Sequence, residues 1–514
     1  MDPFVSSAPR SVSTRVATCS ITNVATQKTI DVLKITRGIS IFNSLDVMAT
    51  SGWIEVMDQG NAIEEYEFNG QEILDLEIVL NEEGYKSAGN SDFNVYKRRF
   101  FIYAIEDIAA MINQMVYRIK FIDPFALMNT DTRISWHFKN MKGEDIIKKI
   151  ETLAENGSNA PYRTAMGLPL SGGNFTPKEQ KLFDFKADVS TREDLDIYVP
   201  MMKPFELIRY IADRVISSDS ENSNCRWSDC LFYQDKNGTY HLNSFKQLFK
   251  QKDPIVFSQQ IASNATQEMQ HLIESYTFNK IYNIQTDKLN GIYGVQFAIA
   301  DFKPTTKKTT IETVLGTNIM SNSGEDKSAD SLKLHESIDK YFDHSLGPIK
   351  NLTSKEAGFI EPFQCAQREL QSVQAAGNQG QQKTSKYDSR TGSLIFLDSC
   401  GIIHEDDNTY DEFKRVTLPY VTGCIMKKVL STYVLNVVMN GAFDVDVGRT
   451  FIIKLEQGEG PQQMAAFLNE VVWLVSDVRH EWRSDTAQVK TYVTGFTPFL
   501  NRGKPATAKP RRES

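Results

Sequence analysis

Apolar and polar residues alternate in short runs between residues 16 and 122. Alternation with a period of two, interrupted by Gly, Asn and Asp, is typical of β-strands joined by turns. The pattern predicts seven strands, at residues 16–21, 31–36, 40–48, 52–57, 73–80, 100–105 and 116–122. Seven short strands in one segment indicate a β-barrel or a β-sandwich.

After Pro124 the apolar spacing becomes helical. Residues 143–156 carry acids in their first turn, and residues 203–218 carry an i, i+3/i+4 apolar stripe, so both are predicted to be helices. Residues 226–245 predict a hairpin, since the Asn237-Gly238 pair in its middle favours a tight turn. This part of the chain therefore predicts an inserted α/β domain.

Strand patterns return at residues 275–301 and 431–457. The chain between them is first Lys/Thr/Ser-rich and later Gln/Gly/Ser-rich, with helical patterns at 328–342 and 408–428. Such a change of composition inside a β-rich segment predicts a large insertion.

One strand–corner–strand pattern occurs twice, at residues 99–122 and 467–496. In both, an aromatic-rich strand leads to a hydrophobic-x-Asp-hydrophobic corner, at residues 105–108 and 475–478, and a second alternating strand follows. The repetition predicts a duplicated β-barrel whose second copy is interrupted. The alternative is that any two antiparallel barrels show aromatic alternation and an Asp at a turn.

Composition narrows the class of protein. The chain has 514 residues, 41% of them apolar and 24% charged, and a net charge of −8, which argues against a general nucleic-acid coat or a binder of anionic membranes. We expect no membrane span and no secretion signal, because no apolar run is long enough. Six scattered cysteines fit reduced thiols in a cytosol.

The charge is unevenly distributed. No basic residue lies between Arg37 and Lys86, and residues 52–83 contain ten acids. Several of them, including Glu55, Asp75 and Glu77, alternate with apolar residues on predicted strands. One interpretation is a solvated sheet face; the other is a wall that repels nucleic acid, because an acidic surface has no counterions to release on contact with phosphates.

No catalytic or metal-binding pattern stands out. The seven histidines show no ligand spacing, and the acids after His404 fit a solvated helix start better than a cation site. Cys225 and Cys230 have no second pair at zinc-site spacing. We therefore expect no catalytic residue, no cofactor and no metal.

Three stretches resemble one family. They are residues 196–245, beginning DIYVPMMKPFELIRY, residues 410–455, including STYVLNVVMNGAFDVDVGRTFIIKL, and residues 471–496, VVWLVSDVRHEWRSDTAQVKTYVTGF. Together with the N-terminal β segment they resemble the baseplate hub protein of contractile-tailed bacteriophages, a relative of the hub module of type VI secretion spike proteins. Residues 303–409 match no part of that pattern.

The resemblance implies an α+β, β-rich fold with two homologous antiparallel tube-type β-barrels and α/β insertion domains. The implied domains are an N-terminal arm (1–15), a first barrel (16–124), an α/β insertion (125–252), a split second barrel (253–302 and 410–500), a large insertion (303–409) and a basic tail (501–514).

The resemblance also implies a function without catalysis: a homotrimer in the virion tail baseplate, assembled in the host cytoplasm. Its partners would be the tail tube protein, the central spike protein, baseplate wedge or other hub proteins, and viral DNA that passes without specific binding, with no membrane involved. Glu55, Asp75 and Glu77 would then be candidate channel-lining acids. Two alternatives remain at this point: an envelope-degrading enzyme within 126–250 or 303–409, and a glycan-binding tail module.

Overall fold

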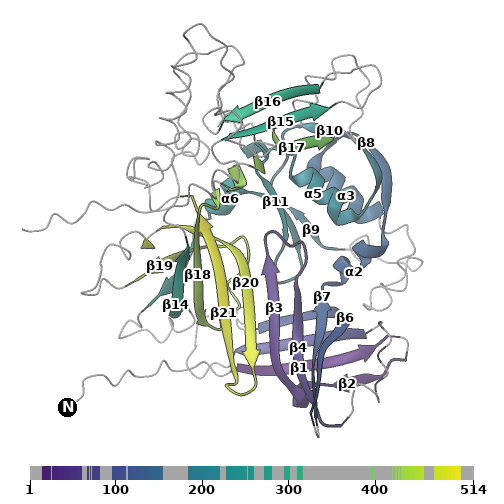
Figure 1. The fold of residues 1–514 in the computed structure, drawn as a ribbon, viewed down its shortest axis with the longest axis vertical. Helices are drawn as coiled ribbons and strands as arrows, with labels where there is room; N and C mark the ends of the chain where they lie inside the picture. Colours follow the sequence, from purple (N-terminus) through teal and green to yellow (C-terminus); the bar gives the residue numbers. More distant parts are fainter. Residues whose placement is uncertain are drawn as a thin grey trace, which may run out of the picture.

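The computed structural model describes residues 14–80, 95–153, 183–259, 271–279, 294–315, 395–398 and 419–498, with short gaps inside several of these ranges. These parts of the chain are β-rich, with large antiparallel sheets and few helices (Figure 1). No helix within them is long and apolar enough to span a membrane.

A single sheet of 13 strands forms the body of the molecule. Its N-terminal strands are β1 (Thr14–Asn23), β2 (Thr29–Asp31), β3 (Thr36–Ser44), β4 (Ser51–Asp58), β5 (Glu72–Leu80), β6 (Val95–Met111) and β7 (Gln114–Ile122). Its C-terminal strands are β13 (Ile255–Ser258), β14 (Ile273–Asn279), β18 (Tyr433–Asn440), β19 (Thr450–Lys454), β20 (Trp473–Arg483) and β21 (Gln488–Thr497).

The N-terminal strands curl around a first hydrophobic core. Every second residue of β4 and β5 points into it, so that Ile54, Val56, Leu74 and Leu76 are at most 1% exposed. Burial of such side chains contributes about 1.5–3 kcal/mol each, which fixes which face of each strand points inward.

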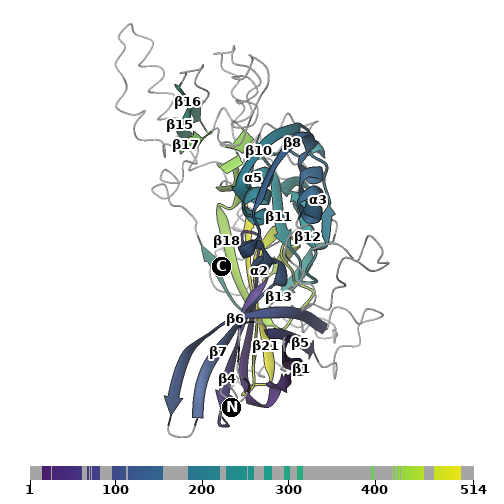
Figure 2. The ribbon, with the colours of Figure 1, turned by 90° about the vertical axis from the view of Figure 1, so that its right-hand side faces the viewer.

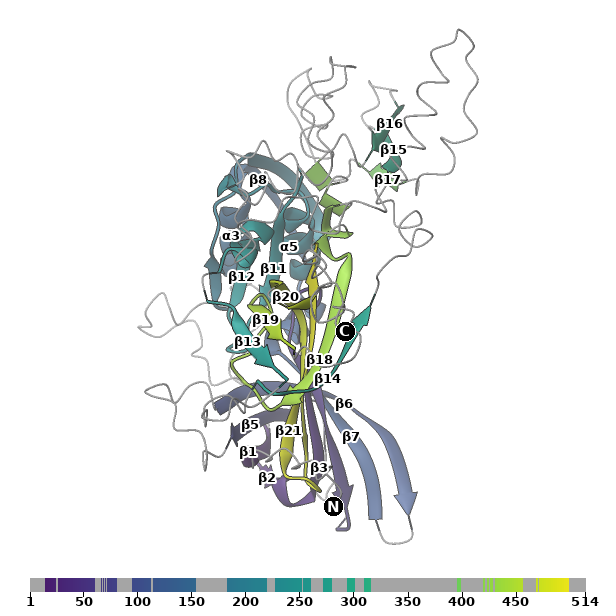
Figure 3. The ribbon, with the colours of Figure 1, turned by 90° about the vertical axis from the view of Figure 1, so that its left-hand side faces the viewer.

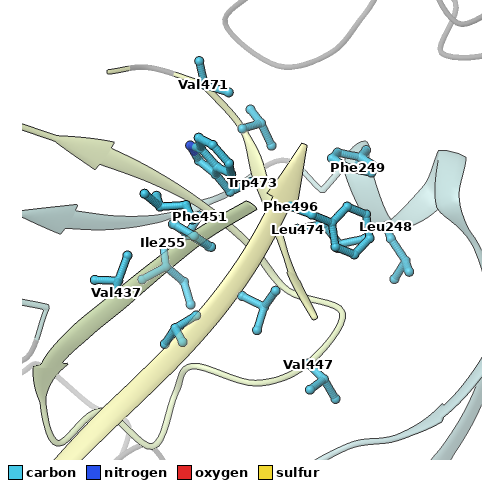
Figure 4. Packing of buried hydrophobic residues seen from close by; sticks show 14 of the residues in the cluster. Leu248, Phe249, Ile255, Val437, Val447, Phe451, Val471, Trp473, Leu474 and Phe496 are labelled. Atoms are coloured by element: carbon cyan, nitrogen blue, oxygen red, sulfur yellow. The ribbon is translucent and has the colours of Figure 1, made fainter. Parts of the chain in front are cut away.

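The C-terminal strands surround a second core (Figure 4). Phe451 lies in its middle, with its ring stacked on Phe257 at 4.5 Å and on Trp473 at 6.4 Å between centroids. A Cβ at Gly495 would lie 2.4 Å from the Phe451 ring, so only glycine lets β21 pass this close.

The two halves of the sheet have the same strand order. The first half runs β3-β4-β7-β6 and the second runs β14-β18-β21-β20, so that each orders its four strands first, second, fourth, third along the chain. In addition, β5 pairs with β6 as β19 pairs with β20, and β1 pairs with β5 as β13 pairs with β19. The last pairing is antiparallel in the first half and parallel in the second.

The halves join edge to edge. In chain order, β20 is the third of the four strands compared in the second half, and β3 is the first of the four in the first half. These two strands pair antiparallel, from Asp477 opposite Ser44 to Arg483 opposite Gly38. The sheet is therefore continuous across the two cores. None of its described strands closes it into a barrel.

A third core belongs to the chain between β7 and β13. There α3 packs against β8 and α5 packs against β10 and β11, and Ile146, Ile211 and Phe138 are among the buried side chains. The elements are α2 (Pro124–Asp131), β8 (Ile134–Lys142), α3 (Gly143–Leu153), β9 (Phe185–Ala187), β10 (Asp194–Met202), α5 (Pro204–Ala212), β11 (Cys230–Gln234), β12 (Tyr240–Ser244) and α6 (Phe245–Phe249).

A separate sheet of three strands is formed by the chain between β14 and β18. It consists of β15 (Gly294–Ala300), β16 (Thr309–Leu315) and β17 (Ile395–Asp398), in the order β16-β15-β17. The predicted helix at 328–342 lies outside the described residues, and most of the one at 408–428 does too.

The prediction of a β-rich chain is confirmed, and two of its details need correction. Residues 31–36 form only the end of β2, the 3-10 turn η1 (Leu33–Ile35) and the start of β3. The two predicted corners are not strand ends. They are register shifts inside long strands, between Glu106 and Ala109 of β6 and between Val475 and Asp477 of β20, where an extra residue strengthens the local twist.

Candidate functional site

The three candidate channel-lining acids do not share one surface. Glu55 lies on β4, whereas Asp75 and Glu77 lie on β5, and all three point away from the first core. β4 and β5 form different walls of the curled sheet, separated in it by β7 and β6. The structure therefore brings Asp75 and Glu77 together but leaves Glu55 elsewhere, and their role in a channel stays a prediction.

Each of these acids faces a basic residue on a neighbouring strand. Asp75 accepts two hydrogen bonds from Arg99, at 2.7 and 3.1 Å, and Glu77 pairs with Lys97 at 2.8 Å. The sequence interpretation missed this compensation, because it considered the acidic run alone. The available signal was the basic run at residues 97–99, directly before the strand predicted at residues 100–105.

A broader surface runs across the junction of the two halves. Residues that point away from both cores on β21, β20, β3, β4 and β7 lie directly opposite one another in register. We call this surface the seam face. It comprises Phe42, Trp53, Glu55, Arg118, Lys120, Arg479, Glu481, Arg483, Lys490 and Tyr492.

Glu481 lies at the centre of the seam face and binds two arginines. Its carboxylate accepts from Arg479 at 2.5 Å and from Arg483 at 2.7 Å, while its side chain is only 7% exposed. The Arg479 guanidinium also stacks on the rings of Phe42 and Tyr492, 5.2 Å from each centroid. These contacts fix Arg479 flat against the sheet.

The other basic residues of the seam face are also paired with carboxylates. Arg118 lies 4.8 Å above the Trp53 ring and pairs with Glu55 at 3.6 Å and with Asp107 at 3.0 Å. The other two ion pairs are Lys120 with Glu106, and Lys490 with Glu274 at 2.8 Å. Every basic residue of the seam face thus has a carboxylate partner, and the five basic residues and their five acidic partners balance in sum.

A buried polar cluster connects the inserted domain to the first half of the sheet. Asp123, the N-cap of α2, forms an ion pair with Arg98 at 2.6 Å, and their side chains are 8% and 6% exposed. Asp123 also accepts hydrogen bonds from Gln234 and Tyr240 of the inserted hairpin, at 2.9 and 3.1 Å. In turn, Gln234 accepts from the backbone N–H and the hydroxyl of Thr50.

The turn of the same hairpin contacts the second half. The half-buried Asp446 carboxylate accepts from the backbone N–H of Lys236 at 2.7 Å and from Asn43 of β3 at 3.3 Å. Burial raises the pKa of Asp446 to about 6. The Lys236 ammonium donates to the carbonyl of Phe443 at 2.8 Å. One hairpin thus fixes the relative position of both halves.

His241 of this hairpin makes stability depend on pH. Burial opposes its charge, but bonds to Asp188 (2.7 Å) and Asp235 (3.4 Å) raise its pKa from 6.5 to about 9. A raised pKa stabilises the fold fully below the unfolded value, and this contribution is lost as pH rises through 9. We expect His241→Gln to lower the melting temperature most near pH 6, and by less than half as much at pH 9.5. A pH-independent difference would contradict this assignment.

The described residues contain no group of three or more side chains suited to hold a metal ion. His404 and the acids after it, and also Cys225, lie outside the described residues, while Cys230 is a buried thiol. Burial lowers the pKa of His480 to about 3, so its imidazole is neutral, between Phe443 and Tyr96.

The ends of β6 and β7 project from the body of the sheet (Figures 2 and 3). We call this part of the β6–β7 hairpin, residues 103–117, the arm. Beyond Phe101, β6 pairs only with β7, so its other edge is open among the described strands. Two large apolar side chains are exposed on the arm, Tyr103 at 50% and Ile108 at 61%. β14 is the end strand of the second half of the sheet, and most of its residues are half or fully exposed.

No family model matches the sequence, and no curated protein matches it. Among solved structures, the chain is similar to a tail protein from Neisseria meningitidis MC58, at 8% identity and a TM-score of 0.43, over 95% of this chain and 96% of that one. It is also similar to a 43 kDa tail protein of prophage MuSo2 from Shewanella oneidensis, at 9% identity and a TM-score of 0.43, over 95% and 98% of the two chains.

A third similar structure is an E. coli component of the type VI secretion system, described as resembling two bacteriophage T4 tail proteins. It matches at 7% identity and a TM-score of 0.35, over 96% of this chain and 79% of that one. Two of these three structures are thus described as tail proteins, one of them from a prophage, and the third as a type VI secretion component.

Proposed function

We propose that this chain is a structural protein of a contractile phage tail, the trimeric baseplate hub that connects a sixfold tail tube to a threefold central spike. The observation that supports this most is the strand order that both halves of the sheet share. The two halves are joined within one chain by the pairing of β20 with β3. A chain with two equivalent repeats side by side fits a symmetry adaptor, because three copies would present six repeats.

The junction inside the chain suggests how copies would join. Within the chain, the third strand of one repeat (β20) pairs with the first strand of the other (β3). The same rule between chains would pair β6, the third strand of the first repeat, with β14 of the next copy. Both edges are open among the described strands, and such head-to-tail contacts form a ring when the rotation closes.

This arrangement would also explain the arm. In β20, the residues that pair with β3 are those from the register shift at Asp477 onward. The matching part of β6 is Asp107–Met111, where Asp107 has a φ of +57° and Ile108 is 61% exposed. In the proposed trimer this segment would lie against β14 of the neighbour, and each repeat would be completed by the next chain instead of closing on itself.

The proposed ring would have a tail tube protein on one side and a spike protein on the other, with further hub or wedge proteins around it, in the virion tail. Viral DNA would pass through its centre. The seam face, which continues across the strands that join the repeats, would be the surface turned towards that DNA. The mass of the native particle tests the proposal, which requires three chains.

A further inference from the structure

We propose that Glu481 keeps the seam face from binding DNA by holding both Arg479 and Arg483 in ion pairs. That DNA passes this face rests on the proposed function, but the chemistry of the face does not. The seam face would then fail to hold DNA because its opposite charges pair with one another, and not because an acidic wall repels phosphates.

The contacts of Glu481 carry this inference. One carboxylate, 7% exposed, engages two guanidinium groups through both of its oxygens, at 2.5 and 2.7 Å. The two arginines remain partly open to solvent, with side chains 37% and 53% exposed. They are therefore accessible to a phosphate, yet their hydrogen-bonding edges already have an anionic partner.

The surroundings of Arg479 would make it a phosphate-binding group if Glu481 were neutral. Arg479 is stacked on Phe42 and Tyr492, and its Nε–H donates to the hydroxyl oxygen of Ser40 at 3.0 Å. Little side-chain entropy therefore remains to be lost on binding. A planar, preorganised guanidinium beside half-buried aromatic rings is a common chemistry of nucleic-acid contact. Glu481 is therefore the partner that would keep the Arg479 guanidinium from binding a phosphate.

The test is Glu481→Gln, which keeps the size of the side chain and removes only its charge. Binding of a fluorescent 30-base-pair duplex to the purified full chain is followed by anisotropy between 50 and 200 mM salt. With two phosphate contacts released, we expect binding roughly tenfold tighter than wild type at 50 mM salt and roughly tenfold weaker again at 200 mM.

The matched control is Glu77→Gln on β5, away from the seam face. It makes the same change of charge beside Lys97 of β6. We expect this control to bind like wild type, and Arg479→Gln combined with Glu481→Gln to lose most of the gain. Equal gains for Glu77→Gln and Glu481→Gln, or no gain for Glu481→Gln, would overturn the proposal.

If circular dichroism shows that Glu481→Gln does not fold, Glu274→Gln replaces it, since it frees Lys490 on the same face and should give a smaller, salt-dependent gain. The readout does not depend on assembly. If the protein forms a three-chain particle but Glu481→Gln binds the duplex no more tightly, only the role of Glu481 is overturned. If Glu481→Gln binds more tightly but the protein stays a single chain, the role of Glu481 stands and the proposed hub is overturned.

Discussion

Replacing Ile108 by aspartate should leave the chain folded and prevent its assembly. In the proposed ring, this residue of the arm is covered by β14 of the neighbouring copy. A carboxylate buried there without a partner would cost about 3–5 kcal/mol per contact, enough to weaken assembly more than ~100-fold. Inward-pointing charges on an edge strand are also a natural means of preventing strand pairing.

The matched control is Val47→Asp. Val47 is similarly exposed, at 54%, but it lies between β3 and β4, outside the arm. Light scattering coupled to size exclusion should give a single-chain mass for Ile108→Asp and the wild-type mass for Val47→Asp. The proposed role of the arm is wrong if Ile108→Asp assembles as wild type does.

Asp123→Asn should destabilise the fold more than any single change at the charged surfaces. It leaves the Arg98 guanidinium, 6% exposed, without its carboxylate, while asparagine can still cap α2 and accept from Tyr240. Removing one partner of a buried ion pair typically costs about 3–5 kcal/mol. The urea midpoint of the transition that includes the inserted domain should therefore fall strongly.

The comparison for this effect is Asp75→Asn. Its partner Arg99 is 43% exposed, and an exposed ion pair contributes at most about 1 kcal/mol. Its urea midpoint should stay close to that of the wild type. Equal midpoints for the two variants would show that Asp123 does not connect the inserted domain to the sheet.

Local patterns were enough to predict the strands that have one buried face. β4 and β5 alternate strictly between core and outside, so their sequence reveals both their extent and their orientation. β8 was missed because most of its residues are exposed, which removes the alternation. α2 was also missed, although Asp123 before Pro124 is a recognisable N-cap followed by proline.

The candidate site could be predicted less well, because it depends on contacts between distant segments. The acids of β5 were found, but their neutralisation by β6 follows from register, which a composition count ignores. Arg479 and Ser40 are 439 positions apart and meet only because β20 pairs with β3. The repeated corner did indicate a duplication, yet only the strand order reveals how the two copies are joined.

The mass of the purified wild-type chain by native mass spectrometry tests the central claim most directly. A symmetry adaptor built from two repeats per chain predicts a particle of three times 58.3 kDa, with no dimer as its main form. A mass of 58.3 kDa at every concentration measured would contradict the account, because the open edges of β6 and β14 would then have no partner in a second copy.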